Sequence, residues 1–305
     1  MIRAFAGRSA LAALLVVGAG PALAAEKGGC DSACLNSLAT NYMAALVTHD
    51  GSKLPWAATV RYAENSVPMM IGDGVWATAT AHDKAPIIVT DAEAGKVVWF
   101  GSIDEHGQPG FYAMELTAKD GRILSVQAVI RRKEGRPPFS DPATFTHDPA
   151  FTAPQGSTSR SAMTGTIERY LLAQPSNSIV PSFGPGCMLV ENGMPMSGLV
   201  PAAQGEAGDC TASFKRGLFQ EMEGMRYRIV ALDEAKGIGA AIGYRDLPAV
   251  NDTFKTADGG TINAEATYPR SLGFITLFRI DNGKIIRIES IANELPYLMP
   301  APWKE

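Results

Sequence analysis

One feature constrains this fold more than any other: the chain carries the same pattern twice. Four phrases recur in the same order, and the first three pairs are separated by 126 to 128 residues. Chance would produce one such match, but hardly several in one order, so we expect two structural units of one kind in tandem. The pairs are Tyr42-Met-Ala-Ala-Leu with Tyr170-Leu-Leu-Ala, Ser52-Lys-Leu-Pro55 with Ser178-Ile-Val-Pro181, Val60-Arg-Tyr-Ala-Glu64-Asn65 with Cys187-Met-Leu-Val-Glu191-Asn192, and Asp120-Gly121-Arg-Ile-Leu with Asn282-Gly283-Lys-Ile-Ile.

The N-terminus has the pattern of an export signal. Arg3 and Arg8 precede an apolar run from Ala10 to Val17, and small residues end the segment at Ala24. The pattern predicts a cleaved signal peptide over residues 1–24. The apolar run is far shorter than the roughly 20 residues that span a bilayer. We therefore expect a periplasmic or secreted protein without stable membrane insertion after cleavage.

The remaining length suits two domains of ordinary size. A stretch rich in Pro, Gly and Ser over residues 136–161 has few periodic apolar positions and predicts a linker. The first domain is then expected over residues 30–135 and the second over residues 162–305. With 27 basic and 31 acidic residues and no basic block, the chain is a poor candidate for binding nucleic acid.

The four cysteines of an exported chain favour disulfide bonds. Among the three possible connectivities we expect Cys187 with Cys210 and Cys30 with Cys34. The second pairing is the more demanding, because cysteines four residues apart within a regular helix seldom meet disulfide geometry. No histidine lies close to either pair, so neither a metal site nor another cofactor is expected.

Each copy places helices before strands. In the first copy, apolar residues from Leu35 to Leu46 recur at helical spacing behind an Asp31/Ser32 cap. Asp120-Gly121 and Asn282-Gly283 are typical of hairpin turns. This order favours an α+β fold with the helices on one face of an antiparallel sheet. Further elements expected in the first copy are a helical turn ending at Pro55, a helical piece over 73–80, and strands over 60–65, 86–90, 96–103, 111–117 and 123–131.

The phrases Tyr62-Ala-Glu-Asn65 with Pro68, and Asn282-Gly-Lys-Ile-x-x-Ile-Glu289, resemble those of nuclear-transport-factor-2-like domains of the SnoaL-like and ketosteroid-isomerase-like kind. The tandem form, with its N-terminal cysteine, is similar to an uncharacterised secreted family of bacteria and fungi. The resemblance implies two tandem cone-shaped domains, each with N-terminal helices packed on a curved antiparallel sheet. It also implies an intramolecular pseudo-dimer, with the sheets face to face, and a monomeric chain. Such cones host isomerases, dehydratases, cyclases and plain binders.

Strand alternation selects the candidate catalytic groups. Tyr62 and Glu64 share one strand face, and Leu189 and Glu191 share the matching face. A carboxylate inside an apolar cone has a raised pKa and can move protons near neutral pH. The alternative is that each glutamate ends its strand and pairs with a surface cation.

Glu289 is the third candidate base. Its counterpart in the first copy is Gln127, which cannot act as a base, so a catalytic Glu289 would make the second copy the active one. The alternative is a charged ladder with Arg287 on the open face of the sheet. Residues expected to contact a substrate are Tyr62, Tyr112, Tyr244 and Tyr268, the last three as oxyanion donors, and Arg131 and Arg270 as carboxylate partners. Trp76 is expected either in the core or as a pocket wall.

Two functions of different class follow. The first is a cofactor-independent lyase or isomerase, of the dehydratase, cyclase or retro-aldol type, acting on a small and partly apolar molecule. The second is a tandem module that binds a small ligand or a peptide without turnover. A buried carboxylate with a tyrosine or arginine in hydrogen-bond reach would favour the enzyme.

Overall fold

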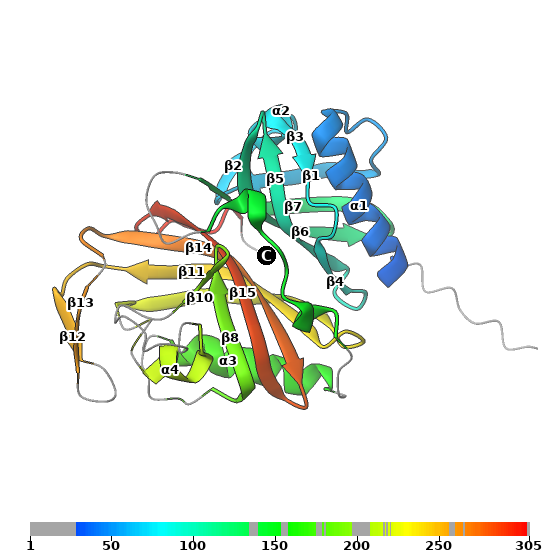
Figure 1. Cartoon of the computed structure of the whole chain (residues 1–305). Helices are drawn as coiled ribbons and strands as arrows, with labels where there is room; N and C mark the ends of the chain where they lie inside the picture. Colours follow the sequence, from blue (N-terminus) through cyan, green and yellow to red (C-terminus); the bar gives the residue numbers. More distant parts are fainter. Residues whose placement is uncertain are drawn as a thin grey trace, which may run out of the picture.

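The computed structural model describes residues 29–133, 140–153, 158–174, 179, 181–196, 208–215, 217, 219, 221–255, 260–264 and 266–303. The expected signal peptide, residues 1–24, lies outside the described residues, as do 136–139 and 154–157 of the expected linker. The described part is a mixed α+β structure of two large sheets and few helices (Figure 1). Within it, no helix combines the length and the apolar character needed to cross a membrane.

The first sheet has the strand order β2-β1-β7-β6-β5-β3, with β4 also paired to β5. We expected an antiparallel sheet, and this is corrected at one pair: β1 runs parallel to β7. The first strand lies beside the last strand of its unit, and the long connection between them lets both run in one direction. The strands are β1 (Trp56–Glu64), β2 (Val67–Met69), β3 (Ala79–His82), β4 (Ile87–Asp91), β5 (Lys96–Glu105), β6 (Gln108–Lys119) and β7 (Arg122–Arg132).

The second sheet repeats this order when it is followed from its other edge, β9-β8-β15-β14-β11-β10. Its first strand, β8, again runs parallel to its last strand, β15. Glu64 stands opposite Ala128 in the first sheet, and Glu191 stands opposite Ser290 in the second. The two glutamates therefore occupy equivalent positions. The strands are β8 (Phe183–Glu191), β9 (Met194–Pro195), β10 (Gly224–Asp233), β11 (Ile238–Leu247), β14 (Arg270–Asp281) and β15 (Lys284–Pro296), with β12 (Thr253–Lys255) and β13 (Thr261–Asn263) as a separate hairpin.

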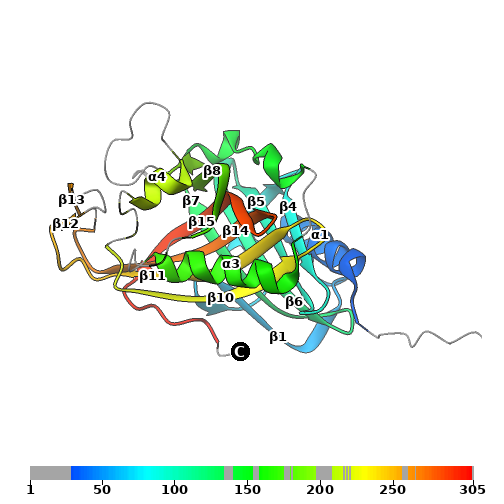
Figure 2. The same ribbon diagram turned by 90° about the horizontal axis from the view of Figure 1, so that it is seen from below.

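Helix α1 begins where the sequence predicts. The side chain of Asp31 accepts a hydrogen bond from the backbone N–H of Cys34 at 2.8 Å, and His49 ends the helix in the left-handed region at φ 55°. Its apolar face is buried against the first sheet, and α3 covers the second sheet in the same way (Figure 2). The helices are α1 (Ser32–Thr48), α2 (Val75–Thr78), α3 (Arg160–Ala173) and α4 (Cys210–Lys215), with 3-10 turns η1 (Pro142–Thr144) and η2 (Pro149–Phe151).

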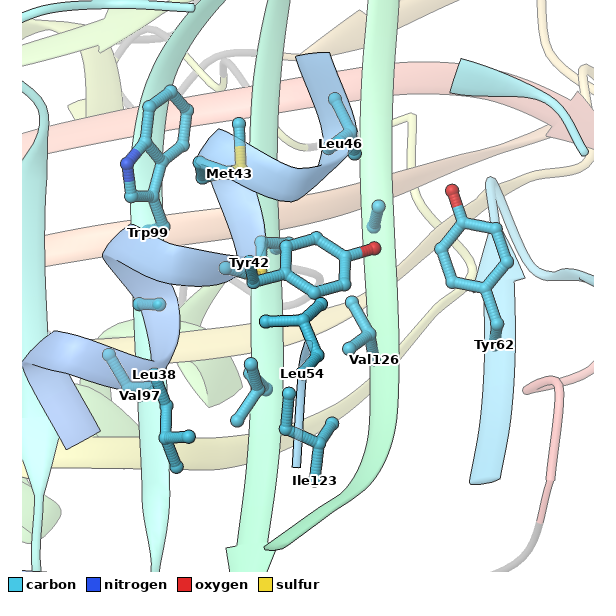
Figure 3. Close-up of a cluster of buried hydrophobic side chains, with 14 of the residues drawn as sticks. Leu38, Tyr42, Met43, Leu46, Leu54, Tyr62, Val97, Trp99, Ile123 and Val126 are labelled. Carbon is cyan, nitrogen blue, oxygen red and sulfur yellow. The ribbon is translucent and has the colours of Figure 1, made fainter. Parts of the chain in front are cut away.

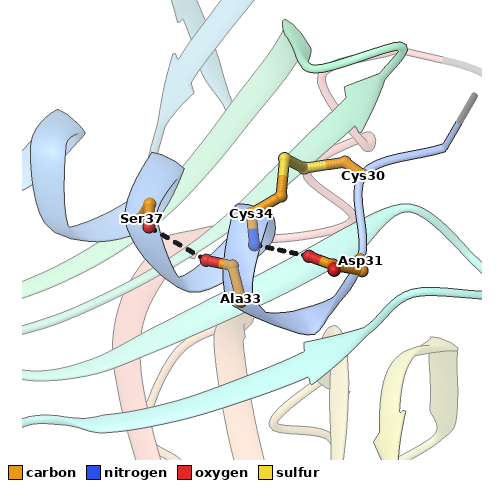
Figure 4. The surroundings of a disulfide bond; sticks show 5 residues. All are labelled: Cys30, Asp31, Ala33, Cys34 and Ser37. Atoms are coloured by element: carbon orange, nitrogen blue, oxygen red, sulfur yellow. Dashed lines mark hydrogen bonds between the residues drawn. A yellow bond between two sulfur atoms is a disulfide. The ribbon is translucent and has the colours of Figure 1, made fainter.

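Both expected disulfides are confirmed. Cys187 on β8 is bonded to Cys210 at the start of α4, with Cα atoms 5.4 Å apart. Cys30 is bonded to Cys34 across 5.2 Å (Figure 4). The second pair is possible because Cys30 precedes the helix and only Cys34 lies within it. The extended backbone of Asp31 brings the two sulfur atoms together.

The described residues form three apolar clusters. One lies between α1 and the first sheet, where Leu38, Tyr42 and Trp99 pack together (Figure 3). A second lies between α3 and the second sheet. The third lies between the two sheets, which pack face to face with their helices on the outer sides. It contains Ile87, Val89, Val98, Phe100, Phe111, Ala113 and Val129 from the first sheet, and Val230, Ala231, Ile238, Ala240, Ile242, Ile275, Leu277 and Ile291 from the second.

Candidate functional site

We call the first sheet with α1 and α2 the first unit, and the second sheet with α3 and α4 the second unit. The interior of the first unit contains Glu64 at the end of β1. Strand alternation places it on the same face as Tyr62, whose hydroxyl donates a hydrogen bond to its carboxylate. The backbone N–H of Val75, the first residue of α2, donates a second bond at 2.7 Å. Gly74 lies against this carboxylate so closely that a Cβ there would come within 2.4 Å of an oxygen. Glu64 therefore caps the short helix α2, and its burial raises the pKa of its carboxyl group.

Aromatic side chains fill the space around Glu64. Tyr42 extends from α1 toward Tyr62 (Figure 3), and its hydroxyl accepts a hydrogen bond from the indole N–H of Trp76 at 2.8 Å. Tyr112, from β6, is fully buried beside them. Burial raises the pKa of all three tyrosines, so their hydroxyls stay protonated. The predicted residues Tyr62, Trp76 and Tyr112 thus come together with Glu64, in a packed interior.

The interior of the second unit holds a buried ion pair. Glu191, at the end of β8, accepts a hydrogen bond from Arg245 of β11, and both side chains are less than one tenth exposed. Arg245 also lies within 3.5 Å of the hydroxyl of Ser290. Its guanidinium faces the ring of Phe274 at 5.1 Å and that of Phe219 at 5.5 Å. These aromatic faces favour the cation where little water can reach it.

A small cavity of about 10 Å³ adjoins this pair. That is space for about one water-sized group. Among its polar lining groups, the amide oxygen of Gln174 is buried and has no hydrogen-bond partner in the described part of the chain. The cavity lining consists of Tyr170, Leu171, Gln174, Leu189, Glu191, Met196, Phe219, Arg245, Phe274, Thr276, Ile288 and Ser290.

Glu289 lies on the other face of the second sheet, away from this cavity. The backbone N–H of Asp148 donates to its carboxylate at 3.1 Å, and His147 Nδ1 lies 3.6 Å from it. His147 Nε2 is 3.1 Å from Asp83, which follows β3 of the first sheet. Burial alone would lower the pKa of His147, but the two carboxylates outweigh it and raise the pKa to about 9. Arg287 pairs with Asp148 rather than with Glu289.

The remaining predicted contact residues lie outside both interiors. Tyr244 is at the contact between the sheets, where its hydroxyl is 2.6 Å from that of Ser66. Arg131 donates to Asn293 at 3.3 Å. The other two share one partner: Tyr268 donates to Glu294, and Arg270 lies 3.5 Å from the same carboxylate.

Two residues of the second interior were not predicted. Arg245 follows the predicted Tyr244 on β11, and its partner Glu191 lies on another strand. The charged pair Arg245-Asp246 directly after the apolar run from Ile238 was the available signal, since a buried arginine requires a partner. Gln174, at the end of α3, carries no signal in the sequence. Within the described residues, no group of three or more His, Cys, Asp or Glu side chains could hold a metal ion.

One protein-family model matches part of the chain. Residues 156–292 match the model described as "Domain of unknown function (DUF8021)". No curated protein matches the chain.

Solved structures similar to parts of the chain include nuclear-transport-factor-2-like proteins. An NTF2-like protein from Burkholderia thailandensis is 16% identical over 43% of this chain and 90% of its own, with a TM-score of 0.25. A LEH-like epoxide hydrolase from M. tuberculosis is 12% identical over 44% of this chain and 84% of its own, with a TM-score of 0.26. A de novo designed protein with a curved β-sheet is 13% identical over 33% of this chain and 88% of its own, with a TM-score of 0.26. Likeness at these scores carries no argument about function.

Proposed function

We propose that the second unit contains the active site of a cofactor-independent proton-transfer enzyme of the lyase or isomerase class. Its substrate is a small and partly apolar carbonyl compound. The observation that carries the proposal is the buried Glu191–Arg245 pair, which lines a cavity with otherwise mostly apolar walls. A carboxylate beside a fixed cation in a dry site combines a base with a group that stabilises negative charge on oxygen.

The chemistry assigns one role to each member of the pair. Glu191 takes a proton from the carbon next to the carbonyl group. The electron pair of the broken C–H bond forms the C=C bond of the enolate, and the π pair of the C=O bond moves to the oxygen. Arg245 stabilises the resulting enolate oxygen with its N–H groups. Return of the proton to another carbon completes an isomerisation, whereas departure of a leaving group from the neighbouring carbon completes an elimination.

A ligand larger than one water must displace part of the cavity wall. Met196 is suited to this movement, because its unbranched thioether side chain adapts to irregular spaces. The first interior is less suited to catalysis, because Glu64 accepts hydrogen bonds from Tyr62 and from the N-terminus of α2 and so holds the local fold. The proposal therefore gives Glu64 a structural role and Glu191 the catalytic one.

The proposal includes the architecture and the export of the chain. Two tandem cone domains, over residues 30–135 and 162–305, form a monomeric intramolecular pseudo-dimer. The repeated strand order and the face-to-face sheets support this arrangement. Cleavage of residues 1–24 releases the chain to the periplasm or the medium, which the two disulfides support.

The test is hydrogen exchange at carbon. Small cyclic ketones are incubated with the mature chain in D₂O, and deuterium incorporation next to the carbonyl is followed by NMR. We expect catalysed exchange that falls about 100-fold in Glu191→Gln, which keeps an acceptor for Arg245 but removes the base. Glu64→Gln, at the equivalent position of the first unit, is the matched control and retains exchange. Circular dichroism verifies that both variants are folded.

A binding module without turnover is the second candidate. It is favoured by the fact that Glu191 and Arg245 already satisfy each other in the structure. Saturable binding of the ketones without any exchange would establish this candidate and reject the enzyme. Equal exchange in wild type and Glu191→Gln would remove the assigned base.

A further inference from the structure

Gln174 occupies an unusual position at the end of α3. Its residue is only 3% exposed, and it lines the cavity beside the Glu191–Arg245 pair. Its Oε1 atom has no hydrogen-bond partner among the described residues. Buried amide oxygens in folded proteins nearly always accept a hydrogen bond, from the protein, from water or from a ligand. An unpaired acceptor on a residue that lines a cavity therefore indicates the chemistry of what enters the cavity.

The surroundings of Gln174 limit that chemistry further. Leu171, Leu189 and Ile288 form apolar walls, so polar ligand groups can be satisfied only at a few points. Arg245 donates hydrogen bonds and requires an acceptor, whereas Gln174 Oε1 accepts and requires a donor. A ligand that satisfies both carries an oxygen acceptor and a separate O–H donor on a compact apolar skeleton.

We propose that Gln174 is a specificity-determining residue and that the second unit selects hydroxylated carbonyl compounds. The inference rests on the proposed function and deepens it by naming the substrate class. The carbonyl oxygen pairs with Arg245, and the ligand hydroxyl donates to Gln174 Oε1. The free volume of about 10 Å³ is enough for one hydroxyl-sized group. A site built to bind a hydroxyl discriminates against the analogue without it, because the protein acceptor is then left unpaired.

The experiment compares matched ligands on the mature chain. Dissociation constants are measured by NMR titration for cyclohexanone and for 2-, 3- and 4-hydroxycyclohexanone. We expect at least one hydroxy isomer to bind about tenfold more tightly than cyclohexanone. In Gln174→Leu the ratio of the two dissociation constants falls below two. Gln174→Met, which keeps the side-chain length without the amide, gives the same result should the leucine variant fail to fold.

The outcomes separate this inference from the proposed function. A preference for the hydroxy isomers that survives both substitutions overturns the role of Gln174. The absence of any preference in wild type, alongside exchange that depends on Glu191, overturns the substrate class and leaves the proposed base in place. If none of the ketones binds, the proposed function fails and this inference fails with it.

Discussion

Glu64 and Glu191 occupy equivalent positions in the two sheets, yet they are held by different partners. Glu64 accepts from Tyr62 two residues away and from the N-terminus of α2. Glu191 pairs with Arg245, 54 residues further along the chain. Glu64 thus accepts hydrogen bonds from neutral donors, whereas Glu191 pairs with a cation. The first arrangement organises a turn of the chain, and the second provides charges beside a cavity.

The neutral surroundings of Glu64 predict a pH-dependent stability difference. Its folded-state pKa is raised, mainly by burial. The protonated carboxyl is therefore favoured in the folded state, and its stabilisation is fully present below the unfolded pKa near 4.5. It is lost as pH rises through the folded value. We expect the free energy of unfolding of wild type, minus that of Glu64→Gln, to fall as pH rises from 4 to 8 in denaturant titrations. A difference that does not change over this range would contradict the burial argument.

His147 predicts a transition in the alkaline range. The imidazole joins Asp83 of the first unit to Glu289 of the second, and its pKa is raised from 6.5 to about 9. A raised pKa means that the stabilisation is complete below pH 6.5 and is lost as pH rises through 9. We expect His147→Ala to reduce the free energy of unfolding by on the order of 2 kcal/mol at pH 6, and by much less at pH 10. The control is His106→Ala at an exposed hairpin tip, which should change the free energy of unfolding little at either pH. An equal loss in His147→Ala at pH 6 and at pH 10 would exclude the ion pairs as the cause.

Local patterns predicted those features whose causes are local. Helix α1 followed from apolar spacing and the Asp31 cap, and the turn at Asp120-Gly121 connects β6 to β7 with positive φ at both residues. Alternation placed Glu64 and Glu191 in the interior, because residues two apart share a strand face.

Features that depend on residues far apart in the sequence could not be predicted from these local patterns. The parallel pairing of β1 with β7 is set by how the chain returns across the sheet, and alternation in one strand carries no direction. Arg245 was missed for the same reason, since its partner is on another strand. Glu289 was expected to line a pocket. It lies instead on the other face of β15, where the segment that contains Asp148 buries it. Burial on both faces of a sheet removes the contrast on which alternation depends.

The disulfide between Cys187 and Cys210 should stabilise the second unit more than Cys30–Cys34 stabilises the first. It closes a loop with a sequence separation of 23 residues, against 4 for the other bond. In the chain-entropy description, a loop of that size contributes about 3 kcal/mol by restricting the unfolded chain. We expect the Cys187→Ser/Cys210→Ser double variant to lose about this much free energy of unfolding in denaturant titrations. The Cys30→Ser/Cys34→Ser variant is the matched control, and a larger loss there would contradict the loop-length argument.

The apolar layer between the sheets predicts that both units unfold together. Leu277 of β14 is fully buried in this layer, where residues of the two sheets pack against each other. Removing its side chain leaves a cavity that both units border, so Leu277→Ala should cost about 2–5 kcal/mol. We expect calorimetry to show one transition in wild type and in the variant, shifted to lower temperature. Val67→Ala, at a half-exposed edge position, should shift it little. If the variant showed two transitions and the substitution lowered the temperature of only one, the sheets would be energetically independent. A shared core transmits the loss of a contact to both partners.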